Sequence, residues 1–195
     1  MVSVHEIEEK NQSAIEITNL IKNLDPLDPE YVLIAKDLSK QYKTKKDRKA
    51  LDKFYLGVKK GQIYGLLGPN GAGKTTFLKI LTGIEKTDTG EAYIGGIDIQ
   101  KRDGDNINVG FCPQFDILWP MLTVTEHLIF FSKFKGIDGN NVDSNVKETI
   151  LGVNLEEDCT KLASQLSGGM KRRLSLAISL TGSPEIVFLD EPSSG

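Results

Sequence analysis

The residues best suited to chemistry lie at 68–76, where glycines, a lysine and hydroxyl side chains follow a short apolar run. Their spacing is G-x-x-x-x-G-K-T, and glycine backbones can turn successive amide N–H groups toward an anion. Lys74 can then reach the β- and γ-phosphates of a nucleotide, and the Thr75 hydroxyl is a ligand for Mg²⁺. A glycine-rich turn with a chance lysine is the plainer alternative. The predicted nucleotide contacts are Gly68, Pro69, Asn70, Gly71, Ala72, Gly73, Lys74, Thr75 and Thr76.

The elements that must position this loop are a strand and a helix. Residues 63–67 are apolar, which is typical of a buried parallel strand, and residues 75–81 have the apolar spacing of a helix. The N-terminus of such a helix carries a partial positive charge that attracts phosphate. This context favours a phosphate-binding loop over a simple turn.

A carboxylate pair, Asp190 and Glu191, follows an apolar strand predicted over 185–189. At the end of a strand near the phosphate-binding loop, Asp190 would hold Mg²⁺ through its water shell, and Glu191 could polarise an attacking water. Adjacent carboxylates after a strand can also be the solvated start of a loop. Their position after a phosphate-binding loop favours the catalytic interpretation.

A second anion site is predicted at Ser167, Gly168 and Gly169, before a basic and then apolar helix over 171–180. Ser167 suits a helix N-cap, and the glycines leave backbone N–H groups open at the positive end of the helix dipole. A well-capped core helix is the alternative.

The remaining elements alternate between strands and helices, with a helical block in the middle of the chain. An amphipathic helix over 4–24 ends at the prolines of 25–29, and Thr123 with Glu126 has capping-box spacing before another helix. Residues 139–141 are predicted to be a loop. Further strands are predicted at 31–35, 38–42, 54–58, 91–94 and 109–112, and a further helix at 143–151. This order predicts an α/β core with an inserted helical subdomain.

Length and charge limit the function classes. The chain has 195 residues and a formal net charge of −3, which is enough for one domain and argues against a dedicated nucleic-acid binder. Neither a membrane-spanning apolar run nor a secretory signal is visible, so we expect a soluble chain. Cys112 and Cys159 lack metal-ligand spacing and fit a reducing compartment.

Together, the motifs at 68–75, 166–170 and 186–191 resemble the nucleotide-binding domain of an ATP-binding cassette (ABC) transporter. The sequences around Gln114, at 122–128 and at 168–173 are most similar to subfamily A, whose members are commonly lipid exporters. Met170 stands where many other subfamilies carry Gln. The resemblance implies a P-loop NTPase core with a mainly parallel sheet and flanking helices, an N-terminal antiparallel β-subdomain and a helical subdomain over about 115–182. The domain would cover 31–195, after a helix and linker over 1–30.

The resemblance also implies roles for individual residues. Tyr42, an aromatic residue before a charged loop, matches the ring that stacks on adenine, although by itself it reads as an ordinary strand residue. Gln114 matches the glutamine that senses Mg²⁺ and whose loop contacts the membrane domains, and Glu191 matches the catalytic base. Residues 167–169 match the signature loop, which faces the ATP bound by a second, head-to-tail cassette. ATP, Mg²⁺, a second cassette and transmembrane domains are thus the implied cofactors and partners, at the cytoplasmic face of a membrane.

The sequence departs from the family pattern after Glu191, where a Leu-Asp-containing loop, another strand and a switch histidine would follow. The histidines, His5 and His127, do not occupy that position. We therefore expect a cassette truncated after the carboxylate pair, lacking C-terminal strands, which binds nucleotide but turns it over poorly. The alternatives are a drug- or polysaccharide-exporter cassette, a non-transport cassette protein acting on ribosomes or chromosomes, and a non-catalytic ATP-binding fragment.

Overall fold

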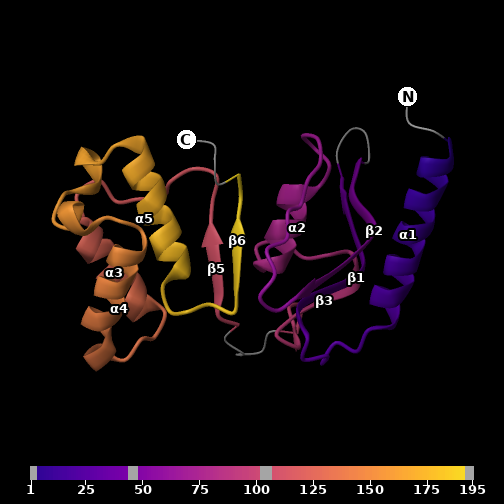
Figure 1. The fold of residues 1–195 in the computed structure, drawn as a ribbon, viewed down its shortest axis with the longest axis horizontal. Helices are drawn as coiled ribbons and strands as arrows, with labels where there is room; N and C mark the ends of the chain where they lie inside the picture. The colour runs from indigo at the N-terminus through magenta and orange to yellow at the C-terminus, as the bar shows by residue number, and fades with distance from the viewer. Residues whose placement is uncertain (1–3, 44–47, 102–106, 192–195) are drawn as a thin grey trace. The chain divides into compact units, whose positions relative to one another are not determined.

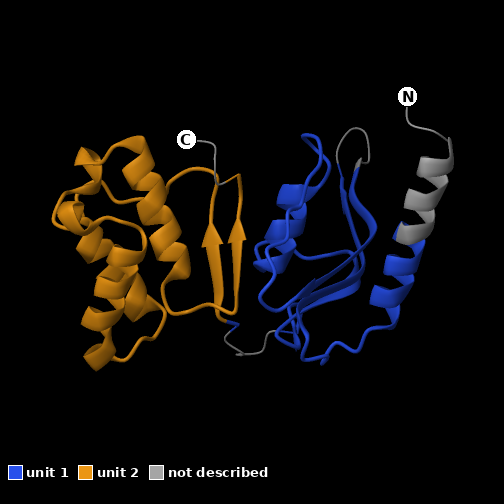
Figure 2. Cartoon of the chain, viewed as in Figure 1, with its two compact units in different colours: residues 1–107 blue, residues 108–195 orange. Residues whose placement is uncertain are grey.

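The protein, analysed as a computed structural model, is a mixed α/β chain, and residues 4–43, 48–101 and 107–191 are described (Figure 1). It divides into two compact units, Met1–Ile107 and Asn108–Gly195 (Figure 2). Each unit contains its own sheet and helices and is described by itself. The domain boundary near residue 30 and the helical subdomain over 115–182 stay predictions.

The first unit is built on a four-stranded antiparallel sheet with the order β2-β1-β3-β4. Its strands are β1 (Tyr31–Tyr42), β2 (Arg48–Lys59), β3 (Thr89–Ile94) and β4 (Ile97–Asp98). The strands predicted at 31–35 and 38–42 are one irregular strand, because the register shifts between Ala35 and Leu38 without ending the pairing. The predicted antiparallel subdomain is thus confirmed.

Helices α1 (Val4–Asn23) and α2 (Lys74–Leu81) complete the first unit. The predicted N-terminal helix is confirmed, and its buried apolar contact is Ile21, which lies near Gly57 of β2. Phe77 of α2 is buried and its ring meets that of Phe54 edge-on at 4.8 Å. This contact holds α2 against the sheet.

The prediction of a strand at 63–67 is wrong. These residues form no strand, and Ile63 and Leu67 are 103% and 93% exposed. A strand requires a neighbour to accept and donate its backbone hydrogen bonds. Within the described residues, the sheet of the first unit contains β1 to β4 and offers this segment no ladder, so Ile63, Tyr64 and Leu67 stay exposed to solvent.

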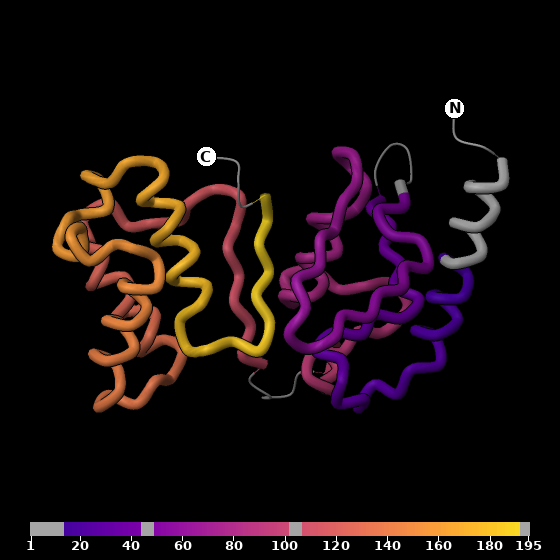
Figure 3. The backbone as a smooth tube through the Cα atoms, in the orientation of Figure 1, coloured from indigo at the N-terminus to yellow at the C-terminus, as the bar shows by residue number. Residues whose placement is uncertain are grey.

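The second unit has a parallel pair of strands, β5 (Val109–Cys112) and β6 (Ile186–Leu189), in which Val109 lies opposite Ile186. Parallel neighbours need a crossover connection, and the tube in Figure 3 follows the chain through the helices before β6 returns beside β5. Gly110 allows this sheet to approach helix α5 (Gly168–Leu180), because a Cβ there would lie 2.0 Å from the Ser179 carbonyl oxygen.

The helical part of the second unit consists of α3 (Val124–Phe134), α4 (Gly139–Gly152) and α5, with short 3₁₀ turns at Glu156–Asp158 and Ala163–Gln165. The predicted loop at 139–141 is wrong, because α4 begins at Gly139. The capping box of α3 at Thr123 and Glu126 is confirmed. Side chains from these elements share one core: Val124, Leu128, Val142, Val146, Ile150, Val153, Leu155, Leu166, Leu174 and Ala177.

Among the described residues, no helix combines the length and apolar character that crossing a membrane requires.

Candidate nucleotide-binding site

The turn before α2 is fixed by Gly73. This residue has φ 94° in the left-handed region, which other residues rarely adopt. A Cβ at this position would lie 2.2 Å from the Ala50 carbonyl oxygen of β2, so the loop also needs the space that glycine leaves. The turn thus starts α2 at Lys74 and holds the loop against the sheet of the first unit.

Lys74 curls back over the loop. Its Nζ donates to the carbonyl oxygens of Gly68 and Pro69 at 2.5 and 3.3 Å. The Ala72 amide donates to the Pro69 carbonyl at 3.0 Å, which closes a tight turn beneath the ammonium group. The result is an ammonium group and a helix N-terminus at one place, which is a suitable arrangement for binding phosphate.

Tyr42 lies at the end of β1 and is half-buried. Lys40 Nζ lies 5.7 Å from its ring centroid and pairs with Glu85 and Asp88 at 2.9 and 3.3 Å. The hydrogen bond to Glu85 raises the pKa of Lys40, so the group stays charged beside the ring. The Gln41 amide donates to Asp88 at 2.7 Å and lowers the pKa of that carboxyl.

In the second unit, Gln114 and the carboxylate pair lie together because β5 and β6 are parallel neighbours and end at the same edge. The Asp190 amide donates to the Cys112 carbonyl at 2.9 Å, which extends the ladder by one step. Beyond it, Gln114 Nε2 donates to Glu191 Oε2 at 3.2 Å. Glu191 has φ 45°, an uncommon conformation that is often found at functional sites.

Arg172 of α5 is a residue that the sequence analysis did not assign to the site. Its guanidinium donates to the backbone carbonyls of Pro113 and, at 3.2 and 3.3 Å, of Asp190 and Glu191. It also lies 3.5 Å from the Asp116 carboxylate. One side chain therefore connects α5 to both strand ends, and the basic run at 171–173 was the available signal.

The predicted second anion site is the N-terminus of α5. Ser167 caps the helix, since its Oγ accepts from the Met170 amide at 3.3 Å. A Cβ at Gly168 or Gly169 would meet nothing within 4 Å, so the space beside these amides is open. The local geometry suits an anion approaching from outside the unit.

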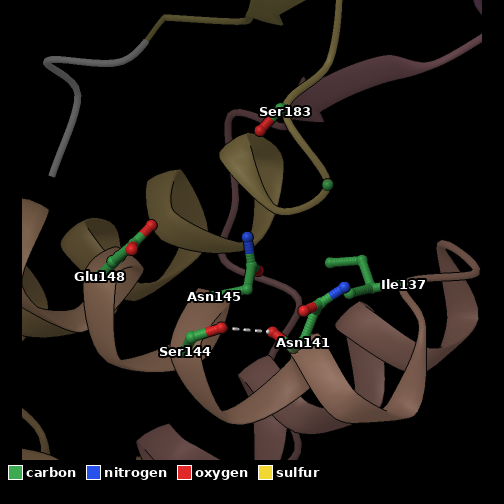
Figure 4. A pocket seen from close by; sticks show the side chains of 7 residues that line it. Ile137, Asn141, Ser144, Asn145, Glu148 and Ser183 are labelled. Carbon is green, nitrogen blue, oxygen red and sulfur yellow. Dashed lines mark hydrogen bonds between the residues drawn. The ribbon is translucent and has the colours of Figure 1, made fainter.

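Other features of the second unit do not contribute to this site. Burial raises the pKa of the Cys112 thiol, which favours the unreactive neutral form. A polar hollow of about 270 Å³ lies between α4 and the turn at Gly182 and Ser183, lined also by Asn141, Asn145 and Glu148 (Figure 4). None of its lining residues is a predicted site residue. Within the described ranges, no cluster of three or more His, Cys, Asp or Glu residues could hold a metal.

The structure therefore groups the predicted residues in two sets. Tyr42 and residues 68–76 belong to the first unit, whereas Gln114, residues 167–169, Asp190 and Glu191 belong to the second. Within the second set, Arg172 joins the two strand ends to α5. Each set contains anion-binding or carboxylate groups that suit phosphate chemistry.

Comparison with known proteins defines the class. A family profile described as ABC transporter matches residues 51–194, and the chain belongs to this family. It is 49% identical over 144 residues to ABC transporter A family member 5 of Arabidopsis thaliana, covering 72% of this chain and 15% of that protein. It is 44% identical over 164 residues to the phospholipid-transporting ATPase ABCA3 of Homo sapiens, covering 84% of this chain and 10% of that protein. The chain is thus a cassette of the A type and spans a small part of these relatives' length.

Solved structures agree with this assignment. The ATP-binding cassette MJ0796, in a dimeric post-hydrolysis state bound to ADP and Pi, matches with a TM-score of 0.72 and 30% identity. The match covers 83% of this chain and 74% of that one. The predicted P-loop NTPase-type cassette fold is confirmed.

Proposed function

We propose that this chain is the ATP-binding and ATP-hydrolysing cassette of a transporter that exports lipid. The observation that carries the proposal is the turn at Gly73 and Lys74, which combines an ammonium group with a helix N-terminus. The chain's similarity to a dimeric cassette bound to ADP and Pi supports the same ligand class. In this proposal, residues 68–76 bind the phosphates and Tyr42 stacks on adenine.

The residues assigned to Mg²⁺ are Thr75, Gln114 and Asp190. Their hydroxyl, amide and carboxylate oxygens are the hard ligands that Mg²⁺ prefers, so the donor set fits the ion. Thr75 lies exposed in the first turn of α2, and Asp190 follows β6 directly. Mg²⁺, when bound with the nucleotide, would neutralise charge on the phosphate oxygens.

Glu191 is proposed as the base that polarises the attacking water, and Gln114 as the residue that orients Glu191. Their hydrogen bond at 3.2 Å supports this pairing. The Arg172 guanidinium fixes the backbone on both sides of the pair. This arrangement limits the motion of the carboxylate, and Glu191 itself is exposed.

A second cassette is proposed to bind at Ser167, Gly168 and Gly169. The open space beside the two glycines supports the approach of a phosphate held by another chain. The dimeric state of the cassette MJ0796 supports the same partner. We expect the nucleotide to be enclosed only when both chains contribute.

The transmembrane domains are proposed to contact an aromatic surface on the second unit. This surface contains exposed large apolar side chains from the segment after Gln114 and from α3: Phe115, Ile117, Trp119, Met121, Phe130 and Phe134. Within it, the ring of Phe130 contacts those of Trp119 and Phe134, at 5.0 and 6.3 Å between centroids. Exposed apolar groups in contact typically mark a protein-binding surface. Its start at Gln114 would connect the state of the nucleotide to the membrane part, at the cytoplasmic face.

Lipid is proposed as the cargo because the chain is similar to the phospholipid-transporting ATPase ABCA3 of Homo sapiens and of Rattus norvegicus. Export of drugs or polysaccharides is the alternative within the same class. Nucleotide binding without turnover is the alternative from another class, and the exposed segment 63–67 favours it.

The experiment that tests the proposal is a titration of the chain with Mg²⁺-ATP by calorimetry, followed by measurement of phosphate release. Saturable binding with release above background supports the ATPase, and binding alone supports the non-catalytic alternative. No binding at millimolar ATP would refute both.

A further inference from the structure

His127 is a fully buried histidine that the nucleotide chemistry does not use. It lies in the first turn of α3, and both ring nitrogens have backbone partners. The Trp119 amide lies 3.0 Å from Nε2, and the Thr123 carbonyl oxygen lies 2.8 Å from Nδ1. A buried imidazole with both nitrogens engaged is well ordered.

These partners determine the protonation state of the His127 ring. An amide can only donate, so Nε2 must be the acceptor and carries no proton. A carbonyl can only accept, so Nδ1 must carry the proton. The site therefore requires the neutral Nδ1–H tautomer. In an imidazolium, the Nε2 proton would face the Trp119 amide proton, and that hydrogen bond would be lost.

The same imidazole supports the Trp119 side chain. The two rings are stacked with centroids 5.7 Å apart and an interplanar angle of 26°. The Trp119 ring also stacks on Phe131, with centroids 5.7 Å apart, and meets Phe130 edge-on, with centroids 5.0 Å apart. Trp119 is still 45% exposed, so it connects the buried His127 ring to the aromatic surface. The contact between His127 and Trp119 is called the anchor below.

We propose that neutral His127 is a positioning residue that holds Trp119, and with it the aromatic surface, and that protonation of His127 releases the segment. Segment 115–121 has no helix or strand of its own, so individual contacts place it. These are the His127 contact, the ion pair of Asp116, backbone hydrogen bonds at Trp119 and Pro120, and the packing of Leu118 against the core. The consequence for docking of transmembrane domains depends on the function proposed above. The anchor itself does not depend on that function.

Charged groups on the surrounding elements do not hold Trp119 in place of His127. Glu126, adjacent to His127 on α3, interacts electrostatically with His127, but its carboxylate is engaged with the Thr123 backbone and side chain. Asp158 pairs with Lys161 at 2.6 Å, and Asp116 lies 3.5 Å from Arg172. The remaining charged groups on α3, α4 and α5 are Lys133, Asp143, Lys147, Glu148, Lys171 and Arg173, and Lys135 directly follows α3. None of the hydrogen bonds and ion pairs described for them involves the His127 ring.

Trp119 is the single tryptophan of the chain, so tryptophan fluorescence comes only from the side chain that stacks on His127. In the 195-residue chain, we expect emission and acrylamide quenching to change when acidification protonates His127. His127→Gln should abolish this change and leave Trp119 more accessible to acrylamide at all pH values. His5→Gln, the matched control at the other histidine, should keep the wild-type profile.

A second measurement needs no variant of His127. In the chain labelled with ¹⁵N-histidine, long-range nitrogen–proton correlations at neutral pH should show His127 as the Nδ1–H tautomer, assigned against His5→Gln. An Nε2–H tautomer or an imidazolium at neutral pH would overturn the proposal. So would a wild-type Trp119 signal that is insensitive to pH, or an unchanged pH profile in folded His127→Gln. Failure to bind ATP would affect only the proposed function.

Discussion

Gln114 and Glu191 are 77 positions apart in the sequence, yet the amide of one donates to the carboxylate of the other at 3.2 Å. The parallel pairing of β5 with β6 causes this contact, because both strands end at the same edge of the sheet. Arg172 then binds backbone carbonyls on both sides of the pair. The proposed base is therefore held by a side chain of α5.

Lys74→Ala should weaken ATP binding by about tenfold or more, because a hydrogen bond to a charged group contributes about 1.5–3 kcal/mol. Its Nζ contacts loop carbonyls, which a bound phosphate would replace or supplement. Calorimetric titration with Mg²⁺-ATP measures the change. Lys79→Ala is the matched control, since Lys79 lies exposed on the same helix. Equal affinity in Lys74→Ala and the parent chain would contradict the assigned role.

Glu191→Gln should reduce phosphate release at saturating ATP by about 100-fold or more, the contribution typical of a positioned general base. The substitution keeps the shape of the side chain, so ATP affinity should change little. Glu185→Gln, an exposed carboxylate just before β6, is the control and should keep the parent rate. Turnover that survives in Glu191→Gln would remove the residue from the proposed mechanism.

Thr123→Ala should lower the free energy of unfolding by about 1 kcal/mol, the usual contribution of an N-cap. Thr123 accepts from the Glu126 amide and caps α3. Urea denaturation followed by circular dichroism measures the loss. Thr160→Ala, at an exposed position outside the helices, should stay within about 0.5 kcal/mol of the parent chain.

The same capping box predicts an acid dependence of stability. Hydrogen bonds from the Thr123 amide and then its hydroxyl lower the pKa of Glu126. A carboxyl with a lowered pKa in the folded state stabilises the fold above its unfolded pKa, about 4.3, and this stabilisation is lost as the pH falls. Glu126→Gln should therefore flatten the decline of the urea midpoint below about pH 5. Parallel declines in both proteins would show that Glu126 has no such role.

Gly110→Ala should destabilise the second unit by about 1–3 kcal/mol or more, the cost of overpacking a tight contact. The added Cβ would lie 2.0 Å from the Ser179 carbonyl oxygen, which belongs to the backbone of α5 and cannot rotate away. Gly152→Ala is the control, because a Cβ there meets nothing within 4 Å. Thermal unfolding of the two variants should differ in midpoint, and similar midpoints would show that α5 can shift away from β5.

Local signals in the sequence predicted much of the fold. The capping box at Thr123, the N-cap at Ser167 and the left-handed turn at Gly73 each depend on neighbouring residues, so sequence spacing was sufficient. The segment 63–67 shows the limit of this reasoning. Its apolar composition favours a strand, but a strand also requires a pairing partner, which the described sheet does not provide.

The sequence by itself determined the family, the glycine-rich turn before α2 and the types of group available for the proposed ATP chemistry, since these depend on residue identity at short spacing. Only the tertiary structure placed Gln114 beside Glu191 and the Arg172 guanidinium against backbone carbonyls on both sides of that pair. It also placed the Trp119 amide against the His127 ring. Such contacts depend on how distant segments pack, and hydrophobic burial and strand pairing decide that packing without a local sequence signal.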